Sequence, residues 1–229
     1  MFLRVSDLSK RFDGLAALTA VTFDLPAGKV LGVLGANGSG KSTLLDLLTG
    51  LIKPDAGDIV LAGESLLNCR ADQVAARKVT RMRQHLSAFD SISAWDYAAL
   101  GLWPRGRRHY PTSADADKVA LALSSLSVWA KRHRALRSLS YFERREADFA
   151  RCLVSEPRLL LIDELASGLT EPERDFFSRQ LGKLGDTSMI VVEHDPDFLR
   201  PVAHDVLVLD QGRVIGHGPT SAYFATPPC

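Results

Sequence analysis

The sequence predicts an α/β fold with a P-loop core, an antiparallel β-subdomain at the N-terminus and an inserted helical subdomain. A glycine-rich loop, residues 35–43, lies between a short apolar run and a segment with apolar residues at helical spacing. Two further apolar runs, 159–162 and 188–192, each end in acidic or polar residues. Such continuous runs are typical of parallel strands buried on both faces, with a site at their carboxyl ends.

The segments before the loop predict antiparallel strands. Residues 2–8 alternate in polarity and predict an edge strand, 10–14 predict a turn, and 17–25 predict a half-buried strand. Phe12 lies in the predicted turn. An aromatic residue at this place is either part of a small core or a plate on which a nucleotide base stacks, and its position upstream of the loop allows the second role.

The loop itself, Gly-Ala-Asn-Gly-Ser-Gly-Lys-Ser-Thr, fits the template G-x-x-x-x-G-K-[ST]. Its glycines let several backbone N–H groups point into one concavity, and the helix that follows adds partial positive charge. Lys41 would reach the β- and γ-phosphates of a nucleotide, and the Ser42 hydroxyl would bind Mg²⁺. The predicted nucleotide-binding residues are Gly35, Ala36, Asn37, Gly38, Ser39, Gly40, Lys41, Ser42 and Thr43.

The middle of the chain is more polar. Residues 70–83 are compatible with a helix, and we interpret their five cations as a solvated face. Residues 93–102 predict a helix that carries Trp95 and Tyr97. Another helix is predicted from residue 113, with acids in its first turn and cations at 131–134 as its end. The cations of the first segment are Arg70, Arg77, Lys78, Arg81 and Arg83, and the apolar side of the last helix is Val119, Leu121, Leu123, Leu126 and Trp129.

Acidic residues follow the run at 159–162. Asp163 would hold Mg²⁺ through water, because this ion prefers hard oxygen ligands. Glu164 would orient or activate a water molecule against the γ-phosphate. The alternative is a pair of solvent-exposed acids that cap a strand. His194 ends the next buried run, so it either senses the same phosphate or has a structural role.

The composition adds few constraints. Of the 229 residues, 46% are hydrophobic and 24% charged, with a net charge of +1, so neither nucleic acid nor an anionic membrane surface is an expected partner. A basic cluster at 105–109 has no interleaved aromatics and indicates a solvated or partner surface. The three cysteines are widely spaced, which favours reduced thiols. We expect no signal peptide and no membrane-spanning segment. If the protein functions at a membrane, another chain would therefore anchor it there.

Taken together, these segments resemble the ATP-binding-cassette ATPases over essentially the whole chain. The resemblance rests on features that occur in the same order as in that family. They are the glycine-rich loop, Gln84, a Leu-Ser pair before a helix, the acidic strand end, Ser167-Gly168-Leu169 and His194. The stretches at 11–18, 139–141 and 192–195 are most similar to ATPase subunits of branched-chain amino acid and urea-type importers. The resemblance implies one ABC ATPase domain, with residues 1–84 and 156–229 as core and β-subdomain and about 85–155 as helical subdomain.

The resemblance also implies roles for single residues. Phe12 would stack on adenine, Gln84 would help bind Mg²⁺ and couple the site to a membrane subunit, Glu164 would be the catalytic base, and His194 would contact the γ-phosphate. Members of the family pair head to tail, and each ATP lies between one P-loop and the other subunit's signature, L-S-G-G-Q or L-S-Y-G-Q. By this resemblance Ser140 would bind the nucleotide of the partner subunit.

The signature of this chain departs from the pattern. It is Leu139-Ser140-Tyr141-Phe142-Glu143, so a large side chain and a carboxylate replace the second glycine and the glutamine. Without the family, Ser140-x-x-Glu143 is a capping box that opens a helix over 142–154. A carboxylate near a γ-phosphate would be repulsive by about 1–4 kcal/mol at effective dielectrics of 80 to 20. Two smaller departures agree with a weakened signature. Leu165 stands where the family usually has Pro, and Thr170 stands where it usually has Asp or Asn.

The leading interpretation is an ATP-binding and hydrolysing subunit that energises a membrane transporter, an importer of amino acids, urea or similar polar solutes. It would lie at the cytoplasmic face of the membrane, held only by permease subunits. Its dimer partner would be a second ABC ATPase whose signature is intact, or a second copy of this chain, in which case both sites would be impaired. The alternative is a nucleotide-binding regulatory subunit with little intrinsic ATPase activity. A soluble ABC ATPase of DNA repair or translation is disfavoured, because 229 residues hold neither a long coiled coil nor a second cassette.

Overall fold

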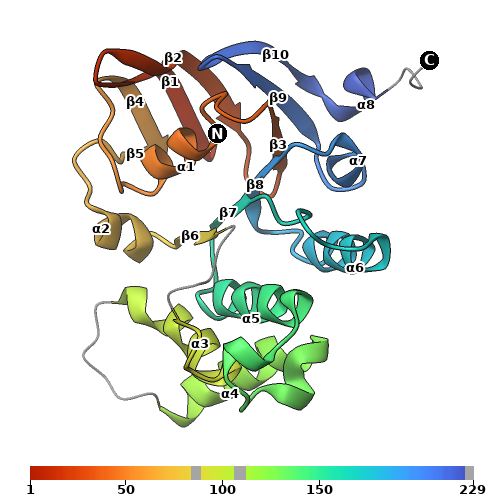
Figure 1. Cartoon of the computed structure of the whole chain (residues 1–229). Coiled ribbons are helices and arrows are strands. Elements are labelled where there is room, and N and C mark those ends of the chain that lie inside the picture. The colour runs from red at the N-terminus through yellow and green to blue at the C-terminus, as the bar shows by residue number, and fades with distance from the viewer. Residues whose placement is uncertain (84–88, 106–111, 225–229) are drawn as a thin grey trace.

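A computed structural model describes residues 1–83, 89–105 and 112–224. Its upper part in Figure 1 contains two β-sheets with helices against them, and its lower part is helical. One sheet has the strand order β2-β1-β4-β5 and the other β10-β9-β3-β8-β7-β6. The strands are β1 Leu3–Phe12, β2 Leu15–Leu25, β3 Val30–Leu34, β4 Ala56–Leu61, β5 Glu64–Ser65, β6 Val79–Met82, β7 Leu159–Asp163, β8 Ser188–Glu193, β9 Asp205–Asp210 and β10 Arg213–Pro219.

The first sheet is antiparallel, and it corrects one expectation. β1 pairs with β2 on one side and with β4 on the other, so the predicted edge strand at its start is an inner strand. The strand also continues to Phe12, and only Asp13 and Gly14 form the turn into β2. The prediction was wrong because alternation shows which face is buried, while an edge is defined by a partner distant in sequence.

The second sheet positions the site. Strands β3, β8, β7 and β6 run parallel, β9 runs parallel to β3, and β10 closes the sheet with an antiparallel pair. Every residue of β7 and β8 is buried, as the continuous apolar runs predicted. Parallel strands place their carboxyl ends at one edge of the sheet, which is where ligands bind in such folds. The glycine-rich loop after β3, Glu164 after β7 and His194 after β8 all follow strands at this edge.

Helices and 3-10 turns occupy most of the remaining described chain. Residues 70–83 contain only a short helix, and their second half is β6, contrary to the expectation of one helix. The later helix ends at Ser124, so the cations at 131–134 do not end it, and Leu121 is exposed rather than part of its apolar side. The helices are α1 Lys41–Leu48, α2 Ala71–Ala76, α3 Ala94–Ala99, α4 Ser113–Ser124, α5 Tyr141–Val154, α6 Glu171–Gly182, α7 Pro196–Leu199 and α8 Thr220–Tyr223, with 3-10 turns η2 Leu100–Arg105, η3 Ser127–Lys131 and η4 Leu136–Ser138.

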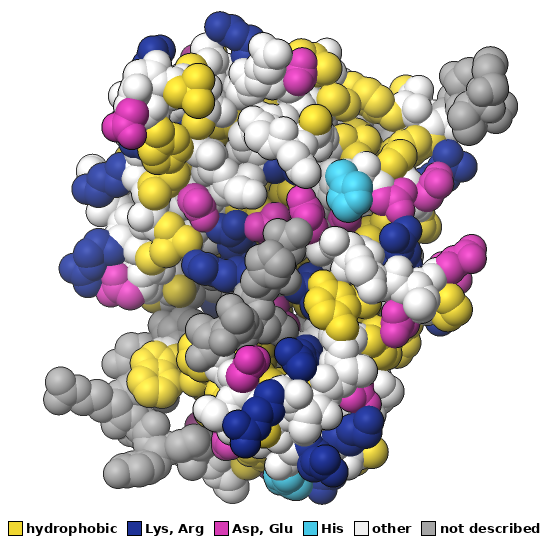
Figure 2. Space-filling model, viewed as in Figure 1, with side chains coloured by type: hydrophobic (Ala, Val, Ile, Leu, Met, Phe, Trp, Pro, Cys, Tyr) yellow, Lys and Arg dark blue, Asp and Glu magenta, His cyan; other side chains and the backbone are white. Residues whose placement is uncertain are grey.

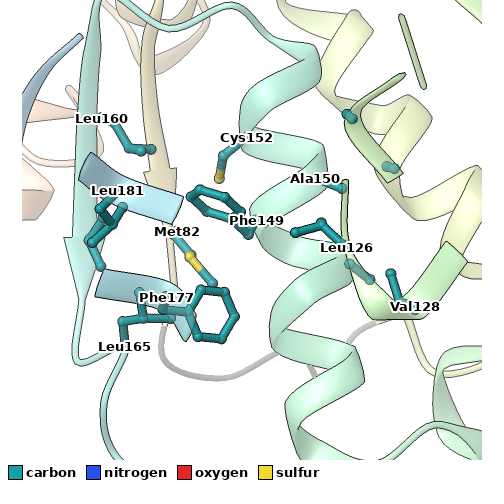
Figure 3. Packing of buried hydrophobic residues seen from close by; sticks show 14 of the residues in the cluster. Met82, Leu126, Val128, Phe149, Ala150, Cys152, Leu160, Leu165, Phe177 and Leu181 are labelled. Atoms are coloured by element: carbon teal, nitrogen blue, oxygen red, sulfur yellow. The ribbon is translucent and has the colours of Figure 1, made fainter. Parts of the chain in front are cut away.

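The core has two clusters of buried side chains. One joins the first sheet, α1 and one face of the second sheet, and the other joins the opposite face to α5, α6 and the helical part. Figure 3 shows the second cluster, in which Phe149 of α5 and Phe177 of α6 lie beside Met82 of β6. Both phenylalanines are at most 1% exposed, and burying each contributes about 2–3 kcal/mol. No helix of the described residues is long and apolar enough to cross a membrane.

Candidate nucleotide site and signature helix

The glycine-rich loop is held in a conformation that requires glycine at two positions. A Cβ at Gly35 would lie 2.4 Å from the carbonyl oxygen of Leu209, and one at Gly40 would lie 2.6 Å from that of Ala17. Gly40, at φ 107°, is also the N-cap of α1, and no side chain caps this helix. The N-terminus of α1 is therefore left with backbone N–H groups for which an anion is a suitable partner.

Lys41 is buried at the first position of α1. Its Nζ donates hydrogen bonds to the carbonyl oxygens of Gly35 (2.6 Å) and Ala36 (2.9 Å). Burial lowers the pKa of Lys41, although the nearby carboxylates of Glu164 and Asp163 act in the opposite direction. The ammonium is thus held inside the loop, where it can pair with phosphate oxygens.

A cavity of about 710 Å³ opens at the loop. This volume lies within the range that small-molecule and cofactor sites occupy. Figure 2 shows acidic side chains and one histidine gathered across the middle of the face in view, between the upper and lower parts of the molecule. The cavity brings the loop together with Glu164 and with the start of β2; it is lined by Leu15, Ala16, Ala17, Asn37, Gly38, Gly40, Lys41, Ser42, Thr43, Glu164 and Gln211.

Glu164 follows β7 with an unusual backbone. Its φ is 48°, in the left-handed region that non-glycine residues seldom adopt, and its N–H donates to the carbonyl oxygen of Val192 at 2.9 Å. The bond to β8 fixes the residue at the point where the chain leaves the sheet. Strained conformations of this kind cluster at functional sites, which supports a role for this carboxylate in the cavity.

Asp163, the last residue of β7, is 7% exposed. One of its oxygens, Oδ2, accepts a hydrogen bond from Nη2 of Arg81 at 2.5 Å. The other end of the same guanidinium lies 2.5 Å from Oδ1 of Asp46 on α1. The interpretation of the cations at 70–83 as a solvated face was therefore wrong for Arg81, whose side chain is only 10% exposed.

The end of β8 carries a histidine and a buried acid. His194 is exposed and follows the strand directly, but it does not line the cavity. Glu193 is fully buried, and its Oε1 accepts a hydrogen bond from the backbone N–H of Ala166 at 2.8 Å. Burial raises the pKa of Glu193 to about 7. This residue ties the loop after Glu164 to the strand end, a role that the apolar pattern did not reveal.

The other predicted nucleotide contacts are placed as follows. Phe12 is 45% exposed and stands opposite Leu15 in the β1–β2 ladder, so it lies next to a lining residue of the cavity without lining it. Ser140 is the N-cap of α5 and does not line the cavity. Gln84 lies outside the described residues, as does most of the basic cluster at 105–109.

The start of α5 confirms the predicted capping box. The Ser140 hydroxyl accepts the N–H of Glu143 at 3.2 Å, and the Glu143 carboxylate accepts the N–H of Ser140 at 2.9 Å. The same carboxylate lies 2.6 Å from Nζ of Lys131. Burial alone would raise the pKa of Glu143, but the hydrogen bonds from Lys131 and Ser140 hold it below its usual value. Two N–H groups at the N-terminus of α5 are thus capped by side chains, whereas no side chain caps α1.

Phe142 anchors α5 to α6. Its ring makes edge contacts with Phe176 and Phe177, with centroids 5.5 and 5.6 Å apart. The neighbouring Tyr141 donates a hydrogen bond from its hydroxyl to the carbonyl oxygen of Ser167 at 3.0 Å, and its ring lies beside Gly168. The residues that replace glycines of the expected signature therefore pack against the segment after Glu164 and against the helix that follows it.

The oxygen donors at the loop and at the end of β7 suit magnesium. Ser42 offers a hydroxyl, and Asp163 offers a carboxylate, both hard oxygen ligands. No group of three or more His, Cys, Asp or Glu side chains that could hold a metal occurs within residues 1–83, 89–105 and 112–224. Magnesium commonly takes one or two protein ligands and completes its shell with phosphate oxygens and waters, so these residues fit the ion.

Comparison with known proteins gives a consistent result. The model of the family described as "ABC transporter" matches residues 18–167. The chain is 32% identical over 98% of its length to the methionine import ATP-binding protein MetN of Mesorhizobium japonicum, of which it spans 62%. It is 28% identical over 94% of its length to the high-affinity branched-chain amino acid transport ATP-binding protein LivG of Escherichia coli strain K12, of which it spans 91%.

Two solved structures share the fold. One is cbiO1 from Clostridium perfringens, described as part of the ABC transporter complex cbiONQ, with a TM-score of 0.86, 25% identity, and coverage of 98% of this chain and 90% of that one. The other is an ATP-binding cassette of an ABC transporter in its ADP conformation, with a TM-score of 0.86, 21% identity, and coverage of 95% and 91%. The predicted α/β fold with a β-subdomain and a helical part is confirmed by these similarities.

Proposed function

Since the chain belongs to the ABC transporter family, whose cassettes are ATPases, we propose that it binds ATP with Mg²⁺ in the cavity at the glycine-rich loop and energises a membrane importer. One observation carries the proposal. A single cavity joins an uncapped helix N-terminus, the buried ammonium of Lys41 and the carboxylate of Glu164. Triphosphate binding and water activation need these three features together.

Each feature has a chemical part in hydrolysis. The loop N–H groups and Lys41 bind and orient the phosphates, and Ser42, Asp163 and Gln84 would hold Mg²⁺. When bound, the ion neutralises charge on the phosphate oxygens. Glu164 orients a water molecule against the γ-phosphorus and accepts its proton, and His194 contacts the γ-phosphate from the neighbouring strand end. Phe12 stacks on the base beside Leu15.

The transported solute is proposed from the relatives. Their names describe import of methionine, of branched-chain amino acids and of sulfate or thiosulfate. We infer a small polar solute, with amino acids and urea as first candidates. The chain would lie at the cytoplasmic face of the membrane and contact it only through permease subunits. Exposed Phe89 and Trp103 of the helical part, at 44% and 79%, would contribute to that contact.

The two helix N-termini support an asymmetric dimer. In the head-to-tail arrangement of the family, the start of α5 faces the partner's ATP. Here the capping box occupies the N–H groups of Ser140 and Glu143, and the Phe142 side chain stands where the family has a glycine that lets the backbone approach the phosphate. We therefore propose pairing with a second ABC ATPase whose signature is intact, which would complete the site at this chain's own loop. The closed signature also favours the second candidate, a nucleotide-binding regulatory subunit with little turnover.

The test measures ATP binding by calorimetry and phosphate release by the purified chain, alone and mixed with ATPase subunits that carry L-S-G-G-Q or L-S-Y-G-Q. The asymmetric dimer predicts binding without appreciable turnover alone, and stimulation by a partner that disappears when this chain carries Glu164→Gln. Robust cooperative hydrolysis by the chain alone would contradict the asymmetric dimer. Binding that no partner converts to turnover would favour the regulatory subunit, and failure to bind ATP would refute both.

A further inference from the structure

Arg81 bridges two carboxylates that come from different elements. Its Nη1 lies 2.5 Å from Oδ1 of Asp46, and its Nη2 lies 2.5 Å from Oδ2 of Asp163. We propose that Arg81 is a positioning residue for nucleotide hydrolysis, which fixes two of the proposed magnesium ligands, Ser42 and Asp163, relative to each other. The inference rests on the Mg·ATP site proposed above.

The bridge spans the parts that carry those ligands. Asp46 lies one turn after Ser42 on α1, and Asp163 ends β7, so the guanidinium connects the helix that bears the hydroxyl to the strand that bears the carboxylate. A planar guanidinium has donors in a fixed fork and can hold two carboxylates at once, which a lysine ammonium does with much less geometric control. The distance between Ser42 and Asp163 is thereby set by a residue that touches neither the ion nor the nucleotide.

The guanidinium is itself held firmly. β6 pairs with β7 in register, with Arg81 opposite Leu161. The carbonyl oxygen of Arg81 accepts a hydrogen bond from Nη2 of Arg151 at 2.7 Å, and Arg151 is fixed in turn by Asp148. With the strand tied on both sides, the Arg81 side chain extends from a rigid base. Burial of the Arg81 side chain strengthens its attraction to the two carboxylates, since the local dielectric is lower than in water.

The bridge also selects which oxygen of Asp163 is available. Oδ2 accepts the Arg81 hydrogen bond, and Oδ1 accepts none from the described residues. With one oxygen engaged, the carboxylate cannot rotate freely and presents the other to water or metal. Groups that orient a metal ligand from behind commonly change metal affinity by about 10–100-fold when they are removed. Arg81 would therefore affect the gain in ATP affinity that Mg²⁺ provides.

The experiment compares dissociation constants of a fluorescent ATP analogue, methylanthraniloyl-ATP, in Mg²⁺ and in EDTA, together with thermal unfolding. In Arg81→Met, the ratio of the dissociation constant in EDTA to that in Mg²⁺ is expected to fall about tenfold, while the affinity in EDTA stays near that of wild type. Arg81→Lys should recover part of the loss. Arg77→Met is the matched control from the same basic segment, because Arg77 pairs with Glu64 on the surface and should change neither value.

A merely structural role gives a different result. In that case Arg81→Met would lower both affinities in parallel with its unfolding temperature, and this outcome, or an unchanged gain from Mg²⁺, would overturn the inference. If Arg81→Met does not fold, Asp46→Ala decides, since it removes the acceptor on α1 and should reduce the gain from Mg²⁺ while the Asp163 pair remains. Wild-type protein that binds the analogue in neither condition would refute the proposed ATP site instead.

Discussion

The ammonium of Lys131 lies 2.6 Å from the carboxylate of Glu143, within a signature where the family has a neutral amide. The sequence alone suggested an isolated carboxylate that would repel a phosphate. With a cation beside it, most of that charge is compensated within the chain. In the asymmetric dimer proposed above, the obstacle to phosphate binding at the start of α5 is therefore the two occupied N–H groups and the Phe142 side chain more than net charge.

The lowered pKa of Glu143 predicts how stability depends on pH. A carboxyl group whose folded pKa lies below its unfolded value adds stability above the unfolded value and loses it as pH falls through the folded value. The unfolding temperature of wild type should exceed that of Glu143→Gln at neutral pH, and the difference should shrink in acid. Lys131→Met should remove most of the pH dependence. A difference that stays constant down to pH about 3 would contradict the assignment.

Phe142 predicts a stability cost for changes at the signature. Its ring packs against Phe176 and Phe177 but is only partly buried, so Phe142→Ala should lower the free energy of unfolding by about 2–3 kcal/mol. Chemical denaturation measures the change. Phe149→Ala, which empties a fully buried site in the same cluster, should cost more. Equal, small effects would mean that the aromatic contacts contribute little.

Two residues of the cavity should separate binding from chemistry. Lys41→Ala removes the ammonium inside the loop, so ATP binding should weaken by at least about tenfold. Glu164→Gln keeps the shape of the side chain and the loop intact, so binding should persist while partner-stimulated phosphate release falls by about a hundredfold or more. Calorimetry and a phosphate-release assay give the two quantities. Loss of binding in Glu164→Gln would show that Glu164 acts in binding.

The aromatic residues of the helical part predict where a permease binds. Trp103→Ala and Phe89→Ala should reduce assembly with a permease subunit and leave ATP binding unchanged, because both side chains are exposed. Tyr97 is the internal comparison. It is buried and donates a hydrogen bond to Asp148, so Tyr97→Phe should change stability more than assembly. Normal assembly of a Trp103→Ala, Phe89→Ala double variant would exclude this surface.

Local patterns predicted much of this molecule. The loop motif, the buried strands at β7 and β8 and the capping box at Ser140 each depend on residues near one another in sequence, and the structure contains all three. The same is true of the helix after the loop.

The missed features join distant parts of the chain. Arg81 and Asp163 are 82 positions apart, and a lone arginine in a polar segment gives no sign of a buried partner. The central position of β1 depends likewise on its pairing with β4. Phe142 was interpreted as a lost glycine, because nothing local indicates that α6 presents two phenylalanines to it.

The packing of Phe142 constrains which substitutions at the signature this chain could tolerate. A return to glycine at this position would remove a side chain that joins α5 to α6, and the glycine would also weaken the first turn of α5. A return of Glu143 to glutamine would leave Lys131 without its partner. Each single reversion is therefore harmful before any benefit at the signature appears. A variant that restores glycine and glutamine at this helix start therefore has to compensate for the lost contacts to α6 and for the lost charge partner of Lys131.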